Sequence, residues 1–189
     1  MVLNPCGWTR TDLVFVAPVS GHVAVLDPEG RTVPSQRLAT GELVFLAEDI
    51  PAFGGRRYEL VALEVSDKGA PSPPVSGEEV LMSSSRYELS IDASTGNIRR
   101  LFDKVSDRKI IASDGKYAGA EFLYVAGRDP KNVQRVSGGA KVNWLDNGPL
   151  VQRVLVESAA PGCRNLRRIY EVVEKPDYVR IEFIIDKEK

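Results

Sequence analysis

Short apolar segments interrupted by turn residues constrain this chain more than any other feature. The segments are rich in Val, Ile, Leu, Tyr and Phe and are bounded by Gly, Pro, Asp or Asn. No window of a dozen residues carries an apolar stripe with the 3.6-residue period of a helix. From Tyr178 to Ile185 the side chains alternate between a fully apolar face and a mostly polar face, as in a half-solvated antiparallel strand. The sequence therefore predicts an all-β fold.

The expected strands recur at intervals of about ten residues, a spacing typical of a sandwich or barrel. They are Leu13–Ala17, His22–Leu26, Leu43–Ala47, Arg57–Val65, Arg86–Asp92, Ile98–Asp103, Glu121–Ala126, Lys141–Leu145, Val151–Glu157, Leu166–Val173 and Tyr178–Ile185. Turn sequences separate them. Asp27–Gly30 combines Pro and Gly as a β-turn requires, Ala93–Asn97 is typical of a hairpin loop, and Asn147–Pro149 breaks the chain before another strand.

The segment from Ser66 to Glu79 differs from the rest in composition. It contains Pro71, Pro73 and Pro74, two glycines and almost no side chain that could be buried. Proline lacks the donor that a strand ladder needs, and the composition is that of an exposed linker. We therefore expect a small β-sandwich domain at residues 1–65, a Pro/Gly-rich linker at 66–79 and part of a larger sheet system at 80–189.

Charge and composition exclude several classes of partner. The 189 residues include 25 Lys plus Arg and 26 Asp plus Glu, and a formal net charge of −1 argues against the basic surface that nucleic acid requires. With 43% apolar and 27% charged residues the chain has the balance of a globular protein. Its longest apolar runs, such as Leu43–Ala47, are far too short to cross a bilayer. We therefore expect neither a nucleic-acid partner nor a membrane partner.

The N-terminal residues and the cysteines bear on compartment. Residues Met1 to Pro5 lack the basic start and long apolar stretch of a signal peptide, which favours a cytoplasmic location. Cys6 and Cys163 are too few for a disulfide scaffold and have the wrong spacing for a zinc knuckle. We interpret both as reduced, small, apolar residues.

The single histidine, His22, limits the available chemistry. A zinc site with two or more His ligands cannot be assembled within the chain. A Ser–His–Asp triad would have to use His22, which follows Gly21 in a strand pattern, where a structural histidine is the commoner case. The sequence also lacks a glycine-rich phosphate loop and a Gly-x-Ser-x-Gly elbow. We predict no catalytic, cofactor-binding or metal-ligating residue in this chain.

Several charged groups invite a catalytic or anion-binding interpretation. The carboxylate pairs that could serve acid–base catalysis are Asp103 with Asp107, Glu171 with Glu174, and Glu182 with Asp186. The basic cluster consists of Arg164, Arg167 and Arg168. Opposite charges lie beside all of them in the sequence, so we interpret both sets as solvated, ion-paired faces of strands and loops.

Aromatic side chains offer a second binding chemistry, because indole and phenol rings stack on the apolar faces of sugars. The candidates are Trp8, Tyr58, Tyr87, Tyr117, Tyr124, Trp144, Tyr170 and Tyr178. We expect most of them to pack in the core or between sheets, with Trp8 capping the core of the small sandwich.

A series of motifs, in order, resembles one enzyme family. Val2–Asp12 is similar to the N-P-x-x-W-x-R-x-D opening of the β domain in the α-mannosidases of glycoside hydrolase family 38. Further landmarks of that family have counterparts in the same order at Leu26–Gly30 (D-x-x-G), Val33–Gln36 (V-P-S-Q), Ile50–Tyr58 (V-P-A-x-G-x-x-x-Y), Arg86–Lys104 (strand, hairpin, strand), Asn147–Leu150 and Tyr170–Asp186. Seven motifs in sequence, covering nearly the whole chain, are specific where each alone is not.

The resemblance implies a fold and a role. It implies a small β-sandwich followed by the first part of a galactose-mutarotase-like supersandwich, in a fragment that begins at an added Met1. In the family the catalytic domain lies upstream of the motif at Asn4 and carries the metal, normally zinc, and the aspartate nucleophile of a retaining mechanism. None of those positions maps onto this chain. The resemblance therefore implies a non-catalytic β region with no cofactor of its own, whose partners are the upstream catalytic domain and the parent's oligosaccharide substrate.

Other functions remain open from the sequence alone. The aromatic residues are compatible with a carbohydrate-binding β-sandwich module. The supersandwich resemblance is compatible with a mutarotase- or epimerase-like sugar-binding domain, although such enzymes commonly use histidines and His22 lies in the smaller domain. An unfinished sheet exposes strand edges, so we also expect homo-oligomers formed through those edges.

Overall fold

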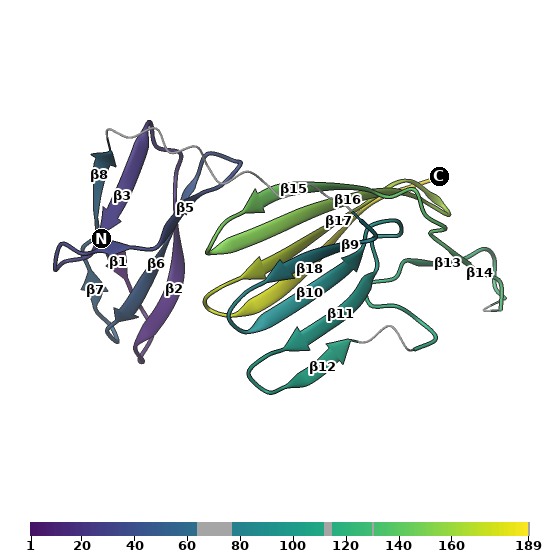
Figure 1. Cartoon of the computed structure of the whole chain (residues 1–189), viewed down its shortest axis with the longest axis horizontal. Helices are drawn as coiled ribbons and strands as arrows, with labels where there is room; N and C mark the ends of the chain where they lie inside the picture. The colour runs from purple at the N-terminus through teal and green to yellow at the C-terminus, as the bar shows by residue number, and fades with distance from the viewer. Residues whose placement is uncertain (64–76, 112–114, 130, 189) are drawn as a thin grey trace. The chain divides into compact units, whose positions relative to one another are not determined.

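The computed structural model describes residues 1–63, 77–111, 115–129 and 131–188. Every regular element in these residues is a β-strand, which confirms the all-β prediction. The chain forms two compact units (Figure 1). The first comprises Met1–Pro71 with two short segments, Asp146–Val151 and Val173–Pro176. The second comprises Ser72–Leu145, Gln152–Val172 and Asp177–Lys189.

Two small antiparallel sheets form the framework of the first unit. One has the order β2-β6-β5 and the other β4-β3-β8, while β1 pairs with β7. The strands are β1 (Val2–Leu3), β2 (Arg10–Val16), β3 (His22–Leu26), β4 (Thr32–Val33), β5 (Ser35–Arg37), β6 (Leu43–Ile50), β7 (Gly55–Arg56) and β8 (Glu59–Leu63). Side chains of β3 and β6 share one core, so the two sheets pack as a small sandwich. Its buried members are Val25, Leu43, Phe45, Ala47 and Ile50.

The second unit is built from two four-stranded sheets, with orders β12-β11-β10-β9 and β15-β16-β17-β18, and a short β13-β14 pair. The strands are β9 (Glu79–Ser83), β10 (Tyr87–Asp92), β11 (Ile98–Asp103), β12 (Arg108–Ile111), β13 (Leu123–Val125), β14 (Val133–Arg135), β15 (Lys141–Asn147), β16 (Val151–Ala160), β17 (Cys163–Val173) and β18 (Tyr178–Lys187). Buried residues of both large sheets form one cluster, as a sandwich requires. They are Val80, Met82, Leu89, Ile91, Ile98, Leu101, Val154, Val156, Tyr170 and Val172.

Each predicted strand has a counterpart, but several short strands carry no sequence signal. Those that the sequence did not predict are β1, β4, β5, β7, β9, β12 and β14. Most are two to four residues long and exist because a partner strand supplies their hydrogen bonds, not because of their own periodicity. Strand β9 begins at Glu79, the last residue of the predicted linker. Residues 66–76 of that linker, and residues 64 and 65 of the predicted strand Arg57–Val65, lie outside the described residues.

Two predicted turns are confirmed in detail. The carboxylate of Asp27 accepts hydrogen bonds from the backbone N–H groups of Glu29 and Arg31, and Gly30 adopts a φ of 78°. The loop Ala93–Asn97 joins β10 to β11, with Gly96 at a φ of 73°. A positive φ favours glycine, which explains its position in both turns.

Candidate functional site

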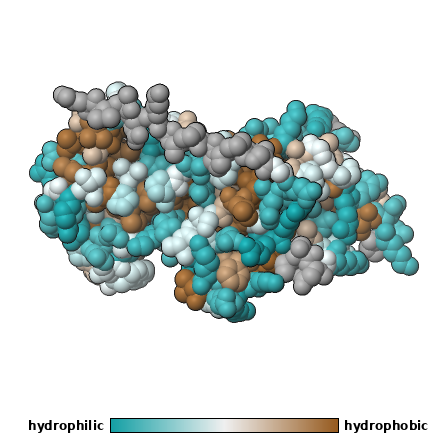
Figure 2. Space-filling model, viewed as in Figure 1, coloured by the Kyte–Doolittle hydropathy of each residue, from teal (hydrophilic) through white to brown (hydrophobic). Residues whose placement is uncertain are grey.

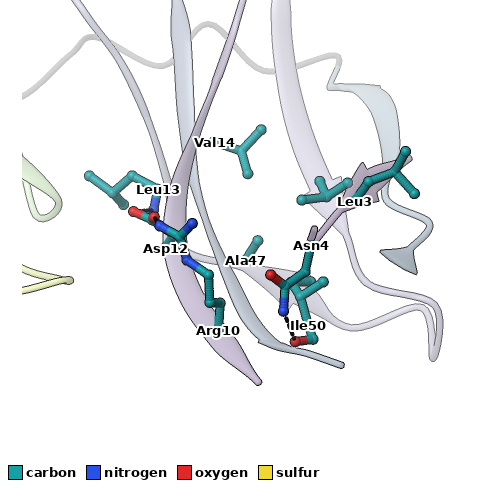
Figure 3. A pocket seen from close by; sticks show the side chains of 9 residues that line it. Leu3, Asn4, Arg10, Asp12, Leu13, Val14, Ala47 and Ile50 are labelled. Atoms are coloured by element: carbon teal, nitrogen blue, oxygen red, sulfur yellow. Dashed lines mark hydrogen bonds and ion pairs between the residues drawn. The ribbon is translucent and has the colours of Figure 1, made fainter. Parts of the chain in front are cut away.

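The first unit contains a pocket beside its N-terminal strand (Figure 3). It has a volume of about 260 Å³. Strands β1, β2 and β6 supply its walls, and Figure 3 shows Asn4, Arg10 and Asp12 as its polar residues. Its lining consists of Val2, Leu3, Asn4, Arg10, Asp12, Leu13, Val14, Ala47 and Ile50. Such a mostly apolar pocket with a few polar groups is the usual form of a small-molecule site.

Asn4, at the base of this pocket, holds three separate pieces of backbone together. Its side chain is buried, and Nδ2 donates to the carbonyl oxygens of Trp8 at 2.7 Å and of Ile50 and Pro51 at 3.1 Å each. Its Oδ1 accepts from the N–H of Cys6 at 3.0 Å. With its hydrogen bonds satisfied by the protein itself, Asn4 is a structural residue of the pocket rather than a free ligand-binding group.

Arg10 and Asp12, which both line the pocket, form an ion pair (Figure 3). Both side chains keep more than a third of their surface exposed. The second oxygen of Asp12 accepts from the N–H of Leu13 at 2.9 Å. An exposed, mutually neutralising pair can orient a polar ligand through hydrogen bonds, but it offers neither a free base nor a free acid.

A second cluster of polar contacts, partly buried, lies elsewhere in the first unit, around Gln36. Its Nε2 donates to the carbonyl oxygen of Val151 at 2.8 Å, and its Oε1 accepts from the N–H groups of Leu150 and Val151 at 3.1 and 2.9 Å. Nearby, the N–H of Ala39 donates to Asp146 Oδ1 at 2.7 Å. These bonds hold the segment Asp146–Val151 within the first unit.

In the second unit, Asp92 organises the loop between β10 and β11. Its Oδ1 accepts from Ser94 N–H, Ser94 Oγ and Thr95 N–H at 2.7 to 2.9 Å, and its Oδ2 pairs with Arg99 at 2.6 Å. Burial opposes ionisation of Asp92, but the Ser94 hydroxyl, Arg99 and Thr95 outweigh it and hold the pKa well below its ordinary value. Asp92 is therefore charged near pH 7 and acts as a structural carboxylate of this loop.

The basic cluster shows where the sequence interpretation was wrong. Arg164 and Arg167 are exposed as expected, but Arg168 is fully buried. Its guanidinium donates to the carbonyl oxygens of Thr95 and Ala120 and, at 2.9 Å, to Oδ1 of Asn97, all neutral acceptors. From Leu166 to Val172 the side chains of β17 alternate and the even-numbered ones face the core, so Arg168 is turned inward despite its charge. Burial lowers the pKa of the Arg168 guanidinium.

Tyr170 lies beside Arg168 on the same face of β17 and is also fully buried. Its hydroxyl donates to the carbonyl oxygen of Gly96 at 2.5 Å. Burial, the largest effect, raises its pKa to about 12 despite the nearby guanidinium. Together the two residues hold the Ala93–Asn97 loop through hydrogen bonds to Thr95, Gly96 and Asn97. The buried guanidinium of Arg168 therefore has a structural role rather than that of an anion-binding group.

The structure places the three candidate carboxylate pairs in different surroundings. Asp103 is buried at the end of β11. Burial raises its pKa, but Arg86 and the backbone N–H groups of Ser106 and Val105 outweigh that effect and lower it. Asp107 is exposed. Glu171 lies 3.6 Å from Arg180 and accepts from the hydroxyl of Tyr178 at 3.2 Å. Glu182 and Asp186 are exposed on β18, as solvated faces require.

Histidine and cysteine residues do not gather either. His22 is half-buried on β3 opposite Leu63, Cys163 is buried, and Cys6 is half-buried in the loop that Asn4 holds. Within residues 1–63, 77–111, 115–129 and 131–188, no three His, Cys, Asp or Glu side chains come together as a metal site would require. The donor set of this part of the chain thus does not fit a zinc ion.

The aromatic residues divide into packed and exposed sets. Tyr58 packs on Phe45 with ring centroids 4.9 Å apart, and Tyr87 and Trp144 pack against the core of the second unit. Trp8, by contrast, is 66% exposed, so the expectation that it caps the small core was wrong. Its backbone carbonyl is held by Asn4, which leaves the indole free to face solvent.

No protein-family model and no curated protein matches this chain. Among the described residues, no helix is long and apolar enough to span a membrane. The surface of the first unit mixes hydrophilic and hydrophobic side chains (Figure 2).

Proposed function

We propose that this chain is a non-catalytic β region of an α-mannosidase that resembles glycoside hydrolase family 38, supporting a metal-dependent catalytic domain that in the family lies upstream of the motif at Asn4. The large sheets of the second unit would then correspond to the first part of a galactose-mutarotase-like supersandwich. The observation that supports this proposal is that landmark motifs contact one another through the buried side chain of Asn4 and the half-buried side chain of Gln36.

The first of these contacts joins the N-P-x-x-W motif to the motif at Ile50–Tyr58. Asn4 opens the former, and its amide binds the carbonyl oxygens of Ile50 and Pro51 in the latter. The backbone reinforces the link, because Asn4 N–H donates to Gly54 O at 2.8 Å and Phe53 N–H to Cys6 O at 3.0 Å. Two motifs about fifty residues apart are thus joined by hydrogen bonds between Asn4–Cys6 and Ile50–Gly54, which we call the Asn4 joint.

The second contact joins V-P-S-Q to Asn147–Leu150. Gln36, the last residue of the former, accepts from the N–H of Leu150, the last residue of the latter, 114 positions away. It also bonds both backbone groups of Val151, the residue that follows the motif. A resemblance that arose by chance would have no reason to select pairs of residues that meet in space. This supports a shared framework in which the motifs specify the joints of the small sandwich.

The chemistry of the parent enzyme would reside in its catalytic domain. Retaining glycoside hydrolysis needs two carboxyl groups about 5 Å apart across the scissile bond. In the candidate pairs of this chain, Asp103 and Glu171 are paired with arginines, while Glu182 and Asp186 are exposed. The described residues also offer no zinc site. The role that fits these residues is therefore mechanical support and positioning.

Binding in trans tests the proposal. The purified chain is mixed with a separately expressed catalytic domain of a family 38 α-mannosidase, and binding is measured by calorimetry while zinc-dependent hydrolysis of an aryl α-mannoside is followed. We expect saturable binding that raises the activity or the melting temperature of the catalytic domain, and no turnover by the chain alone. An unrelated β-sandwich serves as the control. Absence of binding, or turnover by the chain itself above a heat-killed sample, would refute the proposal.

Exposure of Trp8 favours a second candidate function, a carbohydrate-binding module. The indole is 66% exposed, and Asn4, which holds the backbone at Trp8, also lines the pocket that contains the Arg10–Asp12 pair. An aromatic platform beside polar, hydrogen-bonding side chains is how sugar rings are bound.

Fluorescence separates this candidate from the first. Titration with mannose oligosaccharides should change the emission of the Trp144→Phe variant, in which Trp8 is the only tryptophan. The Trp8→Phe variant, which keeps only Trp144, is the matched control and should not respond. Identical responses of the two variants, or none, would exclude Trp8 as a sugar platform.

A further inference from the structure

Strand β18 is the longest edge strand in the part of the chain that the structure describes. It spans ten residues and ends the sheet order β15-β16-β17-β18. The other edge strands of the large sheets are shorter, with seven residues in β15, five in β9 and four in β12. An edge strand presents backbone donors and acceptors that can pair with another chain, and a long one without proline does so most readily.

The two faces of β18 differ sharply. Val179 and Ile181 pack against the core of the second unit. Phe183 and Ile185 continue the same face but are 38% and 48% exposed. The apolar face of the strand is therefore only partly covered, beside an edge that is open in the described structure.

Charges on the opposite face are arranged in a self-complementary order. Arg180, Glu182 and Asp186 are exposed on this face. Arg180 also lies 3.6 Å from Glu171 and over the ring of Tyr178, contacts made within its own sheet. A basic residue near the start of the strand and an acidic one near its end can meet in pairs when two copies run antiparallel.

We propose that β18 pairs antiparallel with β18 of a second copy of this chain, across a two-fold axis at Phe183. In this register Phe183 lies opposite Phe183 of the second copy, Ile181 opposite Ile185, and Arg180 opposite Asp186. Both half-exposed apolar residues are covered and two Arg–Asp pairs form, one on each side of the axis. A two-fold interface of this kind is self-complementary and closes at the dimer.

Neighbouring registers fit less well. With Glu182 opposite itself, two carboxylates meet at the axis. With Ile184 opposite itself, Glu182 meets Asp186. With Ile181 opposite itself, Arg180 meets Glu182, but Ile185 falls opposite Asp177, beyond the start of the strand. Like charges directly opposite each other destabilise a strand pair, and burial of Phe183 and Ile185 decides against the last register.

Charge exchange tests the dimer and its register. Sedimentation velocity on the whole chain should show a dimer. Arg180→Glu should raise the dissociation constant about tenfold or more, because two attractive cross-strand pairs become repulsive. The double variant Arg180→Glu/Asp186→Arg should restore dimerisation. Lys187→Glu is the matched control: it makes the same charge change on the same strand, but Lys187 faces Val179 of the second copy, so dimerisation should persist.

Cross-linking supplies an independent readout. In a Cys6→Ser background, Phe183→Cys should form a disulfide-linked dimer on mild oxidation, because opposed residues of an antiparallel pair lie about 5 Å apart at Cα. Ile185→Cys should not, because it faces Ile181. Circular dichroism confirms that each variant is folded. A monomer at all concentrations overturns the proposal, and so does rescue of Arg180→Glu by Glu182→Arg or cross-linking through Ile181→Cys, since both belong to the rejected register.

Discussion

Replacing Asn4 should destabilise the first unit more than any other single polar substitution there. The Asn4 amide has two N–H donors, which serve the carbonyl oxygens of Trp8, Ile50 and Pro51, and its oxygen accepts from Cys6. Asn4→Ala removes three hydrogen-bonding valences from a residue that is 4% exposed and leaves the buried carbonyl of Ile50 without this donor.

The magnitude follows from the number of bonds lost. At about 1 kcal/mol of net stability for each intramolecular hydrogen bond, the loss is about 3 kcal/mol. Asn4→Asp keeps the shape and the oxygen that accepts from Cys6 but places a carboxylate oxygen against the three carbonyls. At pH 7 its cost should therefore equal or exceed that of Asn4→Ala. An alanine at the exposed Asn132 is the matched control and should change stability by less than about 0.5 kcal/mol.

Hydrogen exchange with mass spectrometry measures this effect locally. The N–H groups of Cys6, Phe53 and Gly54 are held in the joint that Asn4 closes. A loss of about 3 kcal/mol corresponds to exchange about 100-fold faster at these positions, while the Asn132 variant should match the wild type. Urea unfolding should show the same loss as a lower midpoint. Wild-type stability of Asn4→Asp at pH 7 would refute the reasoning, because a carboxylate cannot replace those donors.

Two further predictions concern the second unit and its matched controls. Gly96→Ala should lower the free energy of unfolding by about 3 kcal/mol, because φ is 73° and the new Cβ would lie 2.5 Å from both Arg168 Nη2 and Val156 Cγ1. Gly30→Ala is the matched control: its φ is 78° but the space around it is open, so the loss should be only about 1 kcal/mol. Equal losses in urea unfolding would contradict the proposed clash. Asp92 has a folded-state pKa below its ordinary value of 3.8, so it stabilises the fold above that pH and loses this contribution as the pH falls further. The stability difference between wild type and Asp92→Asn should accordingly be constant near pH 7 and shrink below about pH 4; a difference that widens on acidification would contradict the assignment.

Much of the framework was predictable from local sequence. Alternation of apolar and polar residues over five or more positions identified the long strands, and Asp27–Gly30 and Ala93–Asn97 were recognisable as turns because glycine at positive φ is a local requirement. The short strands β1 and β7 were not predictable. Each has two residues, and they exist only because they pair with each other.

The candidate site was less accessible from sequence. The neighbouring arginines indicate that Arg168 belongs to an exposed basic cluster. Only its position in the alternation of β17 indicates that its side chain faces the core. Leu166 and Tyr170, two positions away on either side, already indicate a buried face at Arg168. The positive charge of Arg168 nevertheless favoured the prediction of an exposed side chain. Trp8 shows the converse, since nothing local indicates that an indole beside a proline turn points to solvent.

The sequence by itself determined the strand pattern, the punctuating turns and the lack of helical periodicity, because all three depend on residues within a few positions of one another. Only the tertiary structure decided which residues form hydrogen bonds between segments that are distant in the sequence. Asn4 meets Ile50 and Pro51, and Gln36 meets Val151, across separations of 46 to 115 positions. Such contacts leave no periodic trace in the chain, because a hydrogen bond between distant segments depends on how the sheets bring them together and not on the spacing of the residues that make it.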